Sequence, residues 1–278
     1  MASGDREWAE REYNPRVLVP DAARIYETWP ERAAETRRRH SPLTHRYGEH
    51  PREVFDLFRA PDAQGTVLFV HGGYWRAFSK DDFSWVADGF LPLWLTVAIL
   101  NYPLTPDVPL ARIVESTRTG FATLYADVLT SAERARVVVA GHSAGGYLAA
   151  LHLATAWDDY GLPEDPICGC VPISGVFSLA PLIDTSMNEA IRLDLAQAGE
   201  LSLHGKPWRS RAPLTLVVGA NESAEFHRQS ADLAAGWAEL EPTMLDVPGR
   251  NHFDVIDGLA DPGSALHATI MEMVKRAG

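Results

Sequence analysis

One short stretch of this sequence has the residue types and spacing of a nucleophile for acyl transfer. Gly141-His142-Ser143-Ala144-Gly145 fits G-x-S-x-G and lies between the apolar run Val137 to Ala140 and a segment rich in Ala and Leu. Strand, sharp turn and helix in this order are typical of a nucleophile elbow, which exposes its serine at the start of a helix. The flanking glycines leave room for the turn. The pattern therefore predicts Ser143 as the nucleophile, because the helix dipole there stabilises developing negative charge.

A serine hydroxyl needs a base to accept its proton, and histidine suits that task at neutral pH. When a serine elbow of this type is used, the chain order is Ser, then acid, then His. His252 follows the last apolar run, Thr243 to Val247, in a loop, and is the predicted general base. The other downstream histidines fit less well: His204 precedes the expected acid, and His227 and His267 fall in helical segments.

The acid that orients this histidine is expected in the loop after the preceding strand. Glu222 follows the apolar run Leu214 to Val218, and its carboxylate would accept the Nδ1–H of His252. Glu225 lies three residues further on, in what is expected to be the first turn of a helix, where the dipole alone favours an acidic residue. We predict Glu222 as the acid, with Glu225 as the alternative.

A second glycine-containing stretch lies where the rest of an oxyanion hole is expected. His71-Gly72-Gly73-Tyr74-Trp75 directly follows the apolar run Thr66 to Val70. Two adjacent glycines allow backbone N–H groups to face a substrate oxygen without interference from a Cβ atom. The expected members of the hole are Gly72, Gly73, Tyr74 and Ala144, the last three as N–H donors. The alternative is a plain Gly-Gly turn in which His71 and Trp75 are packing residues.

The elements that position these residues alternate along the chain. Helical spacing of apolar residues is found in Arg112 to Leu129, Ala144 to Trp157 and Ala224 to Leu240. Short β-branched or aromatic runs predict strands at Val54 to Phe58, Thr66 to Val70, Leu95 to Ile99, Val137 to Ala140, Ile167 to Ile173, Leu214 to Val218 and Thr243 to Val247. Such alternation predicts an α/β fold with a mostly parallel central sheet and helices on both faces.

The chain of 278 residues is expected to form a single domain. Residues 1–50 are interpreted as an N-terminal extension that packs on it, with a helical segment Pro20 to Arg39 that ends before Ser41-Pro42. Residues 175–211 lack a clear period and are expected to form a cap-like excursion over the carboxyl edge of the sheet, where such folds bind ligands.

Composition excludes several classes of partner. A formal net charge of −12 argues against nucleic acid, which needs a concentrated basic surface. The start, MASGDREWAE, lacks the apolar core of a secretory signal, so a cytoplasmic location is expected. The longest apolar stretch, Phe90 to Leu100, contains Pro92 and is too short to cross a bilayer, so no membrane partner is expected. The expected partner is a small-molecule substrate, and a homodimer is compatible with the sequence.

His142 and the two cysteines are expected to be structural. No H-E-x-x-H or comparable cluster is present, so no metal is expected. His142, inside the elbow, is expected to point into the fold. Cys168 and Cys170 alternate along a predicted strand and should lie on opposite faces, where they cannot easily pair.

Several stretches together resemble the kynurenine formamidase (arylformamidase) family of α/β-hydrolases. They are Glu12-Tyr13-Asn14-Pro15, His71-Gly72-Gly73-Tyr74-Trp75, Gly141-His142-Ser143-Ala144-Gly145-Gly146, Ile173-Ser174-Gly175-Val176-Phe177, Glu225-Phe226-His227-Arg228-Gln229-Ser230 and Asn251-His252-Phe253. The resemblance implies hydrolysis of the N-formyl group of N-formylkynurenine to formate and kynurenine, without a cofactor. It also implies that Ser143, Glu222 and His252 form the triad, although the family usually has Asp where this chain has Glu222.

The sequence leaves two alternative functions open. A carboxylesterase would use the same triad, since fold and triad do not fix the substrate. A non-catalytic binding protein of the same fold would normally have a broken triad, which this sequence does not. Tyr74, Trp75 and Phe177 are candidates for an aromatic wall around an aryl substrate, with core packing as the alternative role for each.

Overall fold

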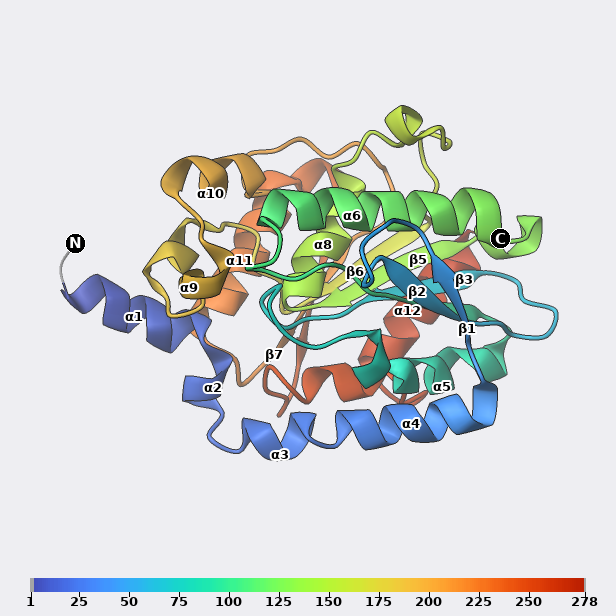
Figure 1. Ribbon diagram of the computed structural model, residues 1–278, viewed down its shortest axis with the longest axis horizontal. Helices are drawn as coiled ribbons and strands as arrows, with labels where there is room; N and C mark the ends of the chain where they lie inside the picture. Colours follow the sequence, from blue (N-terminus) through green and yellow to red (C-terminus); the bar gives the residue numbers. More distant parts are fainter. Residues whose placement is uncertain (1–2, 278) are drawn as a thin grey trace.

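The computed structural model describes residues 3–277 and is built around one eight-stranded sheet (Figure 1). Its strands are β1 (Leu43–Arg46), β2 (Val54–Phe58), β3 (Thr66–Val70), β4 (Thr96–Leu100), β5 (Val137–His142), β6 (Gly169–Ile173), β7 (Thr215–Gly219) and β8 (Thr243–Val247). They lie in the order β1-β2-β4-β3-β5-β6-β7-β8; the pairs β1–β2 and β2–β4 are antiparallel and the others parallel. The predicted, mostly parallel sheet is confirmed.

Helices cover both faces of this sheet (Figure 1). One face is covered by α6 (Leu110–Thr123), α8 (Ala144–Leu153) and α11 (Ala224–Gly236), and α10 (Leu195–Leu201) adds Ala198 to the same core. The other is covered by α4 (Trp29–His40), α5 (Ala87–Phe90) and α12 (Ala265–Arg276). All five residues of β3 are buried; Leu68 and Val70 pack in the first core while Val67 and Phe69 pack in the second. A strand buried on both faces is continuously apolar, which explains the pattern of this stretch in the sequence.

Cys168 and Cys170 lie on opposite faces of the sheet, as predicted. Cys170 belongs to the core beneath α8, whereas Cys168 packs against the core beneath α12, and both are free thiols. Burial raises the pKa of the Cys168 thiol to about 11, so it is not a reactive thiolate at neutral pH.

The N-terminal segment is more irregular than predicted and joins the sheet. It forms α1 (Ser3–Tyr13), α2 (Pro15–Leu18), α3 (Ala22–Tyr26) and α4, so the single helix expected over Pro20 to Arg39 is in fact two helices. Pro30 lies in the first turn of α4, where its missing N–H does no harm, and a helix running through from α3 would lose a hydrogen bond there. β1 was not predicted because its sequence, Leu-Thr-His-Arg, has little apolar character and it lies largely exposed at the sheet edge.

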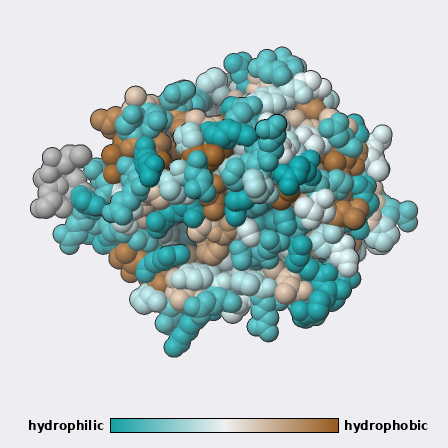
Figure 2. All heavy atoms as spheres, in the orientation of Figure 1, coloured by the Kyte–Doolittle hydropathy of each residue, from teal (hydrophilic) through white to brown (hydrophobic). Residues whose placement is uncertain are grey.

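Residues 175–211 leave the sheet after β6 and pack tightly. They contain a 3₁₀ turn (Ala180–Asp184), α9 (Asn188–Ile191) and α10. The excursion contacts the N-terminal segment, where the N–H of Ser186 donates to Glu10 Oε2 at 2.8 Å. In Figure 1, α9 and α10 lie at the end of the molecule near α1, and Figure 2 shows hydrophobic groups at that end among otherwise mostly hydrophilic side chains. Within residues 3–277, no helix has both the length and the apolar character needed to cross a bilayer.

Candidate active site

Ser143 occupies the sharp turn between β5 and α8. Its backbone has φ 55° and ψ −119°, a strained conformation of the kind that clusters at functional sites. The flanking glycines are sterically required: a Cβ on Gly141 would lie 2.1 Å from the carbonyl oxygen of Gly145, and a Cβ on Gly145 would lie 2.0 Å from that of Val70. The Ser143 N–H donates to the carbonyl of Ile173 at 2.8 Å, which fixes the turn against β6.

His252 and Glu222 come from the two loops that follow the last two strands of the sheet. His252 Nδ1 and Glu222 Oε2 are 2.6 Å apart, and both side chains are almost completely buried. The other carboxylate oxygen, Oε1, accepts from the Ser174 hydroxyl at 2.5 Å and from the Gly219 N–H at 2.7 Å. With three donors around it, the carboxylate is fixed in orientation, and it holds the imidazole as the Nδ1–H tautomer.

The alternative acid, Glu225, lies in the first turn of α11 and is engaged by residues other than His252. Its carboxylate accepts hydrogen bonds from the Tyr13 hydroxyl and from the Arg228 guanidinium, the latter at 2.7 and 2.8 Å. The ion pair with Arg228 holds the pKa of Glu225 below its ordinary value, against the opposing effect of burial. The structure thus brings Glu222, not Glu225, to the histidine.

The glycine-rich loop after β3 turns its backbone toward Ser143. Gly73, Tyr74 and Trp75 all have positive φ, at 109°, 48° and 55°. Within residues 3–277, the N–H groups of Gly73, Tyr74 and Ala144 donate to no backbone carbonyl, so they remain free for a ligand oxygen. A Cβ on Gly72 would lie 3.1 Å from the Ser143 Cβ, which puts this loop in direct contact with the serine.

Buried aromatic groups hold the loop in place. The Tyr102 hydroxyl donates to the carbonyl of His71 at 2.8 Å, and the two rings stack with centroids 4.3 Å apart. Burial lowers the pKa of His71 to about 4, so this side chain is neutral and structural at neutral pH. The Tyr74 hydroxyl donates to the carbonyl of Tyr13, which ties the loop to the N-terminal segment.

His142, the variable residue of the elbow, supports the histidine loop. Its Nε2 lies 2.8 Å from the carbonyl oxygen of His252, and the two rings are 4.9 Å apart. Because a carbonyl only accepts, Nε2 carries the proton. Burial, together with the neighbouring His252, holds the pKa of His142 well below its ordinary value, so the ring stays neutral.

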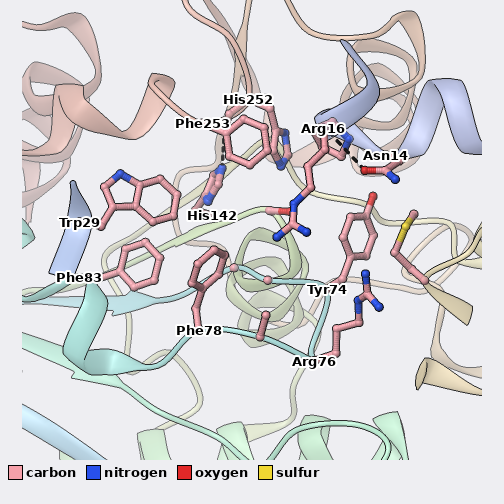
Figure 3. Close-up of a pocket in the computed structure, with 16 residues that line it drawn as sticks. Asn14, Arg16, Trp29, Tyr74, Arg76, Phe78, Phe83, His142, His252 and Phe253 are labelled. Carbon is pink, nitrogen blue, oxygen red and sulfur yellow. Dashed lines mark hydrogen bonds between the residues drawn. The ribbon is translucent and has the colours of Figure 1, made fainter. Parts of the chain in front are cut away.

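A cavity of about 340 Å³ opens beside Ser143 and His252, within the size range of small-molecule sites (Figure 3). Tyr74 lines it as expected, but Trp75 and Phe177 do not. Trp75 is fully buried with its ring edge-on to Tyr147, and Phe177 lies in the core beside Gly175, so the expectation that they face the substrate is corrected to core packing.

Most of the cavity wall was not predicted. The lining residues missed in the sequence are Asn14, Pro15, Arg16, Trp29, Arg76, Ala77, Phe78, Phe83, Met187 and Phe253. Asn14, Pro15 and Phe253 fell within stretches that carried the family resemblance, which was the one available signal. Among residues 3–277, no group of three or more His, Cys, Asp or Glu side chains is arranged to hold a metal ion.

Comparison with known proteins agrees with this architecture. The family model described as alpha/beta hydrolase fold matches residues 67–254. Kynurenine formamidase of Danio rerio is 25% identical over 288 residues, covering 98% of this chain and 95% of the relative. Esterase LipC of Mycobacterium tuberculosis is also 25% identical, covering 91% of this chain and 71% of the relative. The crystal structure of a protein described as a candidate thioesterase from Silicibacter sp. TM1040 superposes with a TM-score of 0.84 and 33% identity, covering 94% of this chain and 98% of that one. The chain therefore belongs to the alpha/beta hydrolase fold family and is a hydrolase that resembles the kynurenine formamidases.

Proposed function

We propose that this protein is a serine hydrolase that cleaves the C–N bond of an aryl formamide such as N-formyl-L-kynurenine and releases formate. Ser143 Oγ attacks the formyl carbon while His252 Nε2 takes the hydroxyl proton. The carbonyl oxygen becomes an oxyanion that accepts hydrogen bonds from the free N–H groups of Gly73, Tyr74 and Ala144. Glu222 keeps the proton of Nδ1 in place and stabilises the imidazolium that forms.

The intermediate then collapses in two balanced steps. The C–N bond breaks as His252 gives its proton to the departing nitrogen. The arylamine is released, and the formyl group remains as an ester on Ser143. Water attacks this ester, giving a proton to His252, and the C–O bond to Ser143 breaks as that proton returns to the serine. An arylamine nitrogen is weakly basic, so it leaves more readily than an alkylamine.

The observation that carries the proposal is the shared location of Ser143 and His252 on one cavity with aromatic walls. The hydrogen bond between His252 and Glu222 supports the assignment of base and acid. Similarity to kynurenine formamidases along nearly the whole chain supports the formamide substrate.

The test is formate release from N-formyl-L-kynurenine by the purified protein. We expect turnover that disappears in Ser143→Ala and persists in Ser131→Ala, a matched change at an exposed serine outside the cavity. A fluorophosphonate probe should label the wild type and Ser131→Ala but not Ser143→Ala. Formate release by Ser143→Ala at the wild-type rate would refute the mechanism.

A carboxylesterase is the second candidate, and the similarity to Esterase LipC favours it. The same nucleophile, base and oxyanion donors would act on an ester, with an alcohol as the leaving group. Serine-dependent cleavage of p-nitrophenyl acetate without formate release from N-formyl-L-kynurenine would assign the protein to this second function.

A further inference from the structure

The cavity beside Ser143 has an unusual charge for a chain with net charge −12: it is lined by two arginines and by no acidic side chain among the described residues. The two are Arg16 and Arg76, both exposed at the rim. Neither forms an ion pair with any side chain that the structure describes. Two uncompensated guanidinium groups at one opening favour an anionic ligand.

The two arginines come from distant segments that are fixed to each other. Arg16 lies in α2, where its N–H donates to the Asn14 side chain at 3.3 Å. Its guanidinium lies over the Tyr26 ring, 5.3 Å from the centroid. The Arg76 N–H donates to the carbonyl of Gly73 at 3.0 Å, in the loop that carries the oxyanion donors. The hydrogen bond between the Tyr74 hydroxyl and the N-terminal segment joins these two sides of the rim.

Aromatic residues occupy the opposite side of the cavity. Figure 3 shows Trp29, Phe78 and Phe83 gathered on one side and Arg16 and Arg76 on the other. Trp29 contacts both phenylalanines, with ring centroids 5.4 Å from Phe78 and 5.0 Å from Phe83. An aromatic wall facing a cationic rim, in the cavity that Ser143 also lines, fits a substrate that has an aromatic part and a negatively charged part.

We propose that Arg16 and Arg76 form a carboxylate subsite that selects substrates with an acidic group on the leaving side of the scissile bond. Guanidinium groups match carboxylates because their N–H donors are arranged as a planar fork. The inference rests on the proposed function, in which the arylamine that leaves carries an α-amino-acid carboxylate. The subsite raises affinity and orients the substrate; the bond-breaking steps remain with Ser143 and His252.

The experiment compares N-formyl-L-kynurenine with ortho-formamidoacetophenone, which keeps the ring, ketone and formamide but lacks the whole α-amino-acid group, ammonium as well as carboxylate. The arginine variants then isolate the part of the difference that belongs to the carboxylate. In Arg16→Gln and Arg76→Gln we expect KM for the first substrate to rise roughly tenfold, the typical effect of losing a charged hydrogen bond at a partly exposed site. The kcat for both substrates and KM for the neutral one should stay nearly unchanged. Arg16→Lys should restore part of the affinity, because it restores charge without the fork.

The matched control is Arg24→Gln, which removes one positive charge from the same N-terminal segment at a highly exposed position outside the cavity. It should leave both substrates unaffected. Binding of kynurenine to Ser143→Ala, measured by calorimetry with and without the arginine changes, gives a readout independent of turnover. Weaker binding in the arginine variants supports the subsite; equal binding in all of them overturns it.

The outcomes separate the two proposals. Formamide cleavage with equal KM values in wild type and arginine variants keeps the proposed function and refutes the subsite. If the protein cleaves only esters, the same comparison uses phenyl acetate and ortho-acetoxyphenylpropanoate, its carboxylated analogue. A preference for the carboxylated ester that disappears in the arginine variants then supports the subsite, although the formamidase function has failed. Equal KM values for the two esters refute the subsite as well as the formamidase function.

Discussion

The substitution Glu222→Gln tests the role of the buried carboxylate, because the structure dictates how the amide must orient. In the wild type, Oε1 accepts from the Gly219 N–H and the Ser174 hydroxyl, and Oε2 accepts from His252. A backbone N–H can only donate, so the amide oxygen of the introduced glutamine must take the place of Oε1. The NH₂ group of that side chain then faces His252 Nδ1. Two donors cannot share a hydrogen bond, and the imidazole must shift its proton to Nε2.

That tautomer cannot accept the proton of Ser143, because its Nε2 already carries one. The corresponding carboxylate-to-amide change in a serine protease of unrelated fold lowers kcat about 10⁴-fold through the same tautomer error. We expect a loss of about 10³- to 10⁴-fold here, equivalent to about 4 to 5.5 kcal/mol in the activation free energy. The protein should still fold, because Gln fills the same volume and only the hydrogen bond to His252 reverses its direction.

The assay is kcat for formate release and for p-nitrophenyl acetate, together with circular dichroism and the Tm of each variant. The matched control, Glu225→Gln, changes the alternative acid and should leave kcat nearly unchanged while lowering the Tm, since Glu225 anchors Tyr13. A Glu222→Gln enzyme with kcat within tenfold of the wild type, or a Glu225→Gln enzyme with the larger loss, would refute the assignment.

Three further outcomes follow from packing and burial. Gly145→Ala should destabilise the fold by at least about 3 kcal/mol in urea unfolding, because the new Cβ would lie 2.0 Å from a backbone oxygen. The control is Gly199→Ala, where a Cβ would meet nothing within 4 Å; it should stabilise the fold by about 0.5 to 1 kcal/mol. Burial lowers the pKa of His152 to about 4, below its unfolded value, so its contribution to stability is complete above about pH 6.5 and is lost as pH falls toward 4. His152→Phe should therefore lessen the decline of the unfolding free energy over this range by on the order of 3 kcal/mol; parallel curves for the two proteins would contradict this. Tyr74→Phe should lower stability by about 1 to 3 kcal/mol, because the buried carbonyl of Tyr13 loses its donor, and an unchanged Tm would contradict it.

The parts of the site that the sequence predicted depend on local chain geometry. Ser143 was identifiable because only small residues fit around its turn, a constraint that Gly141 and Gly145 satisfy directly. The central strands β3 to β7 were predictable because burial on both faces demands continuous apolar runs. Glu222 could be ranked above Glu225 only by its distance from the strand. What separates them is the Gly219 N–H, which holds Glu222 toward the sheet edge, and no sequence pattern encodes that bond.

The cavity wall could not be predicted because it is made by tertiary contacts between remote segments. Trp75 and Tyr74 are adjacent and equally aromatic, yet positive φ values at both residues turn one ring into the core and leave the other at the cavity. Trp29, the first residue of α4, lines the cavity because that helix packs beside Phe83, which is remote in the sequence. A sequence pattern shows that such residues are apolar, but it does not show whether they pack in the core or line the cavity.

The N-terminal stretch Glu12-Tyr13-Asn14-Pro15 and the helix α11 are the clearest example of a feature that tertiary contacts explain. Both stretches resembled the same family, although neither has a turn or pattern that would require its residues locally. In the structure they are partners across 212 residues: the Tyr13 hydroxyl donates to Glu225, and Gln229 Nε2 approaches it at 3.1 Å. Gln229 Oε1 in turn accepts from the N–H of Phe177 at 2.9 Å, which joins the excursion to the same network.

This network links the cavity wall to the loop that holds Glu222. Helix α11 begins two residues after Glu222, so the helix that anchors Tyr13 also fixes the end of the loop that orients His252. The backbone carbonyl of Tyr13 in turn accepts the hydrogen bond of the Tyr74 hydroxyl, from the loop with the proposed oxyanion donors. Because one buried tyrosine connects the wall, the acid loop and the oxyanion loop, the two motifs are expected to occur together in any chain that builds its site this way, although neither touches the scissile bond.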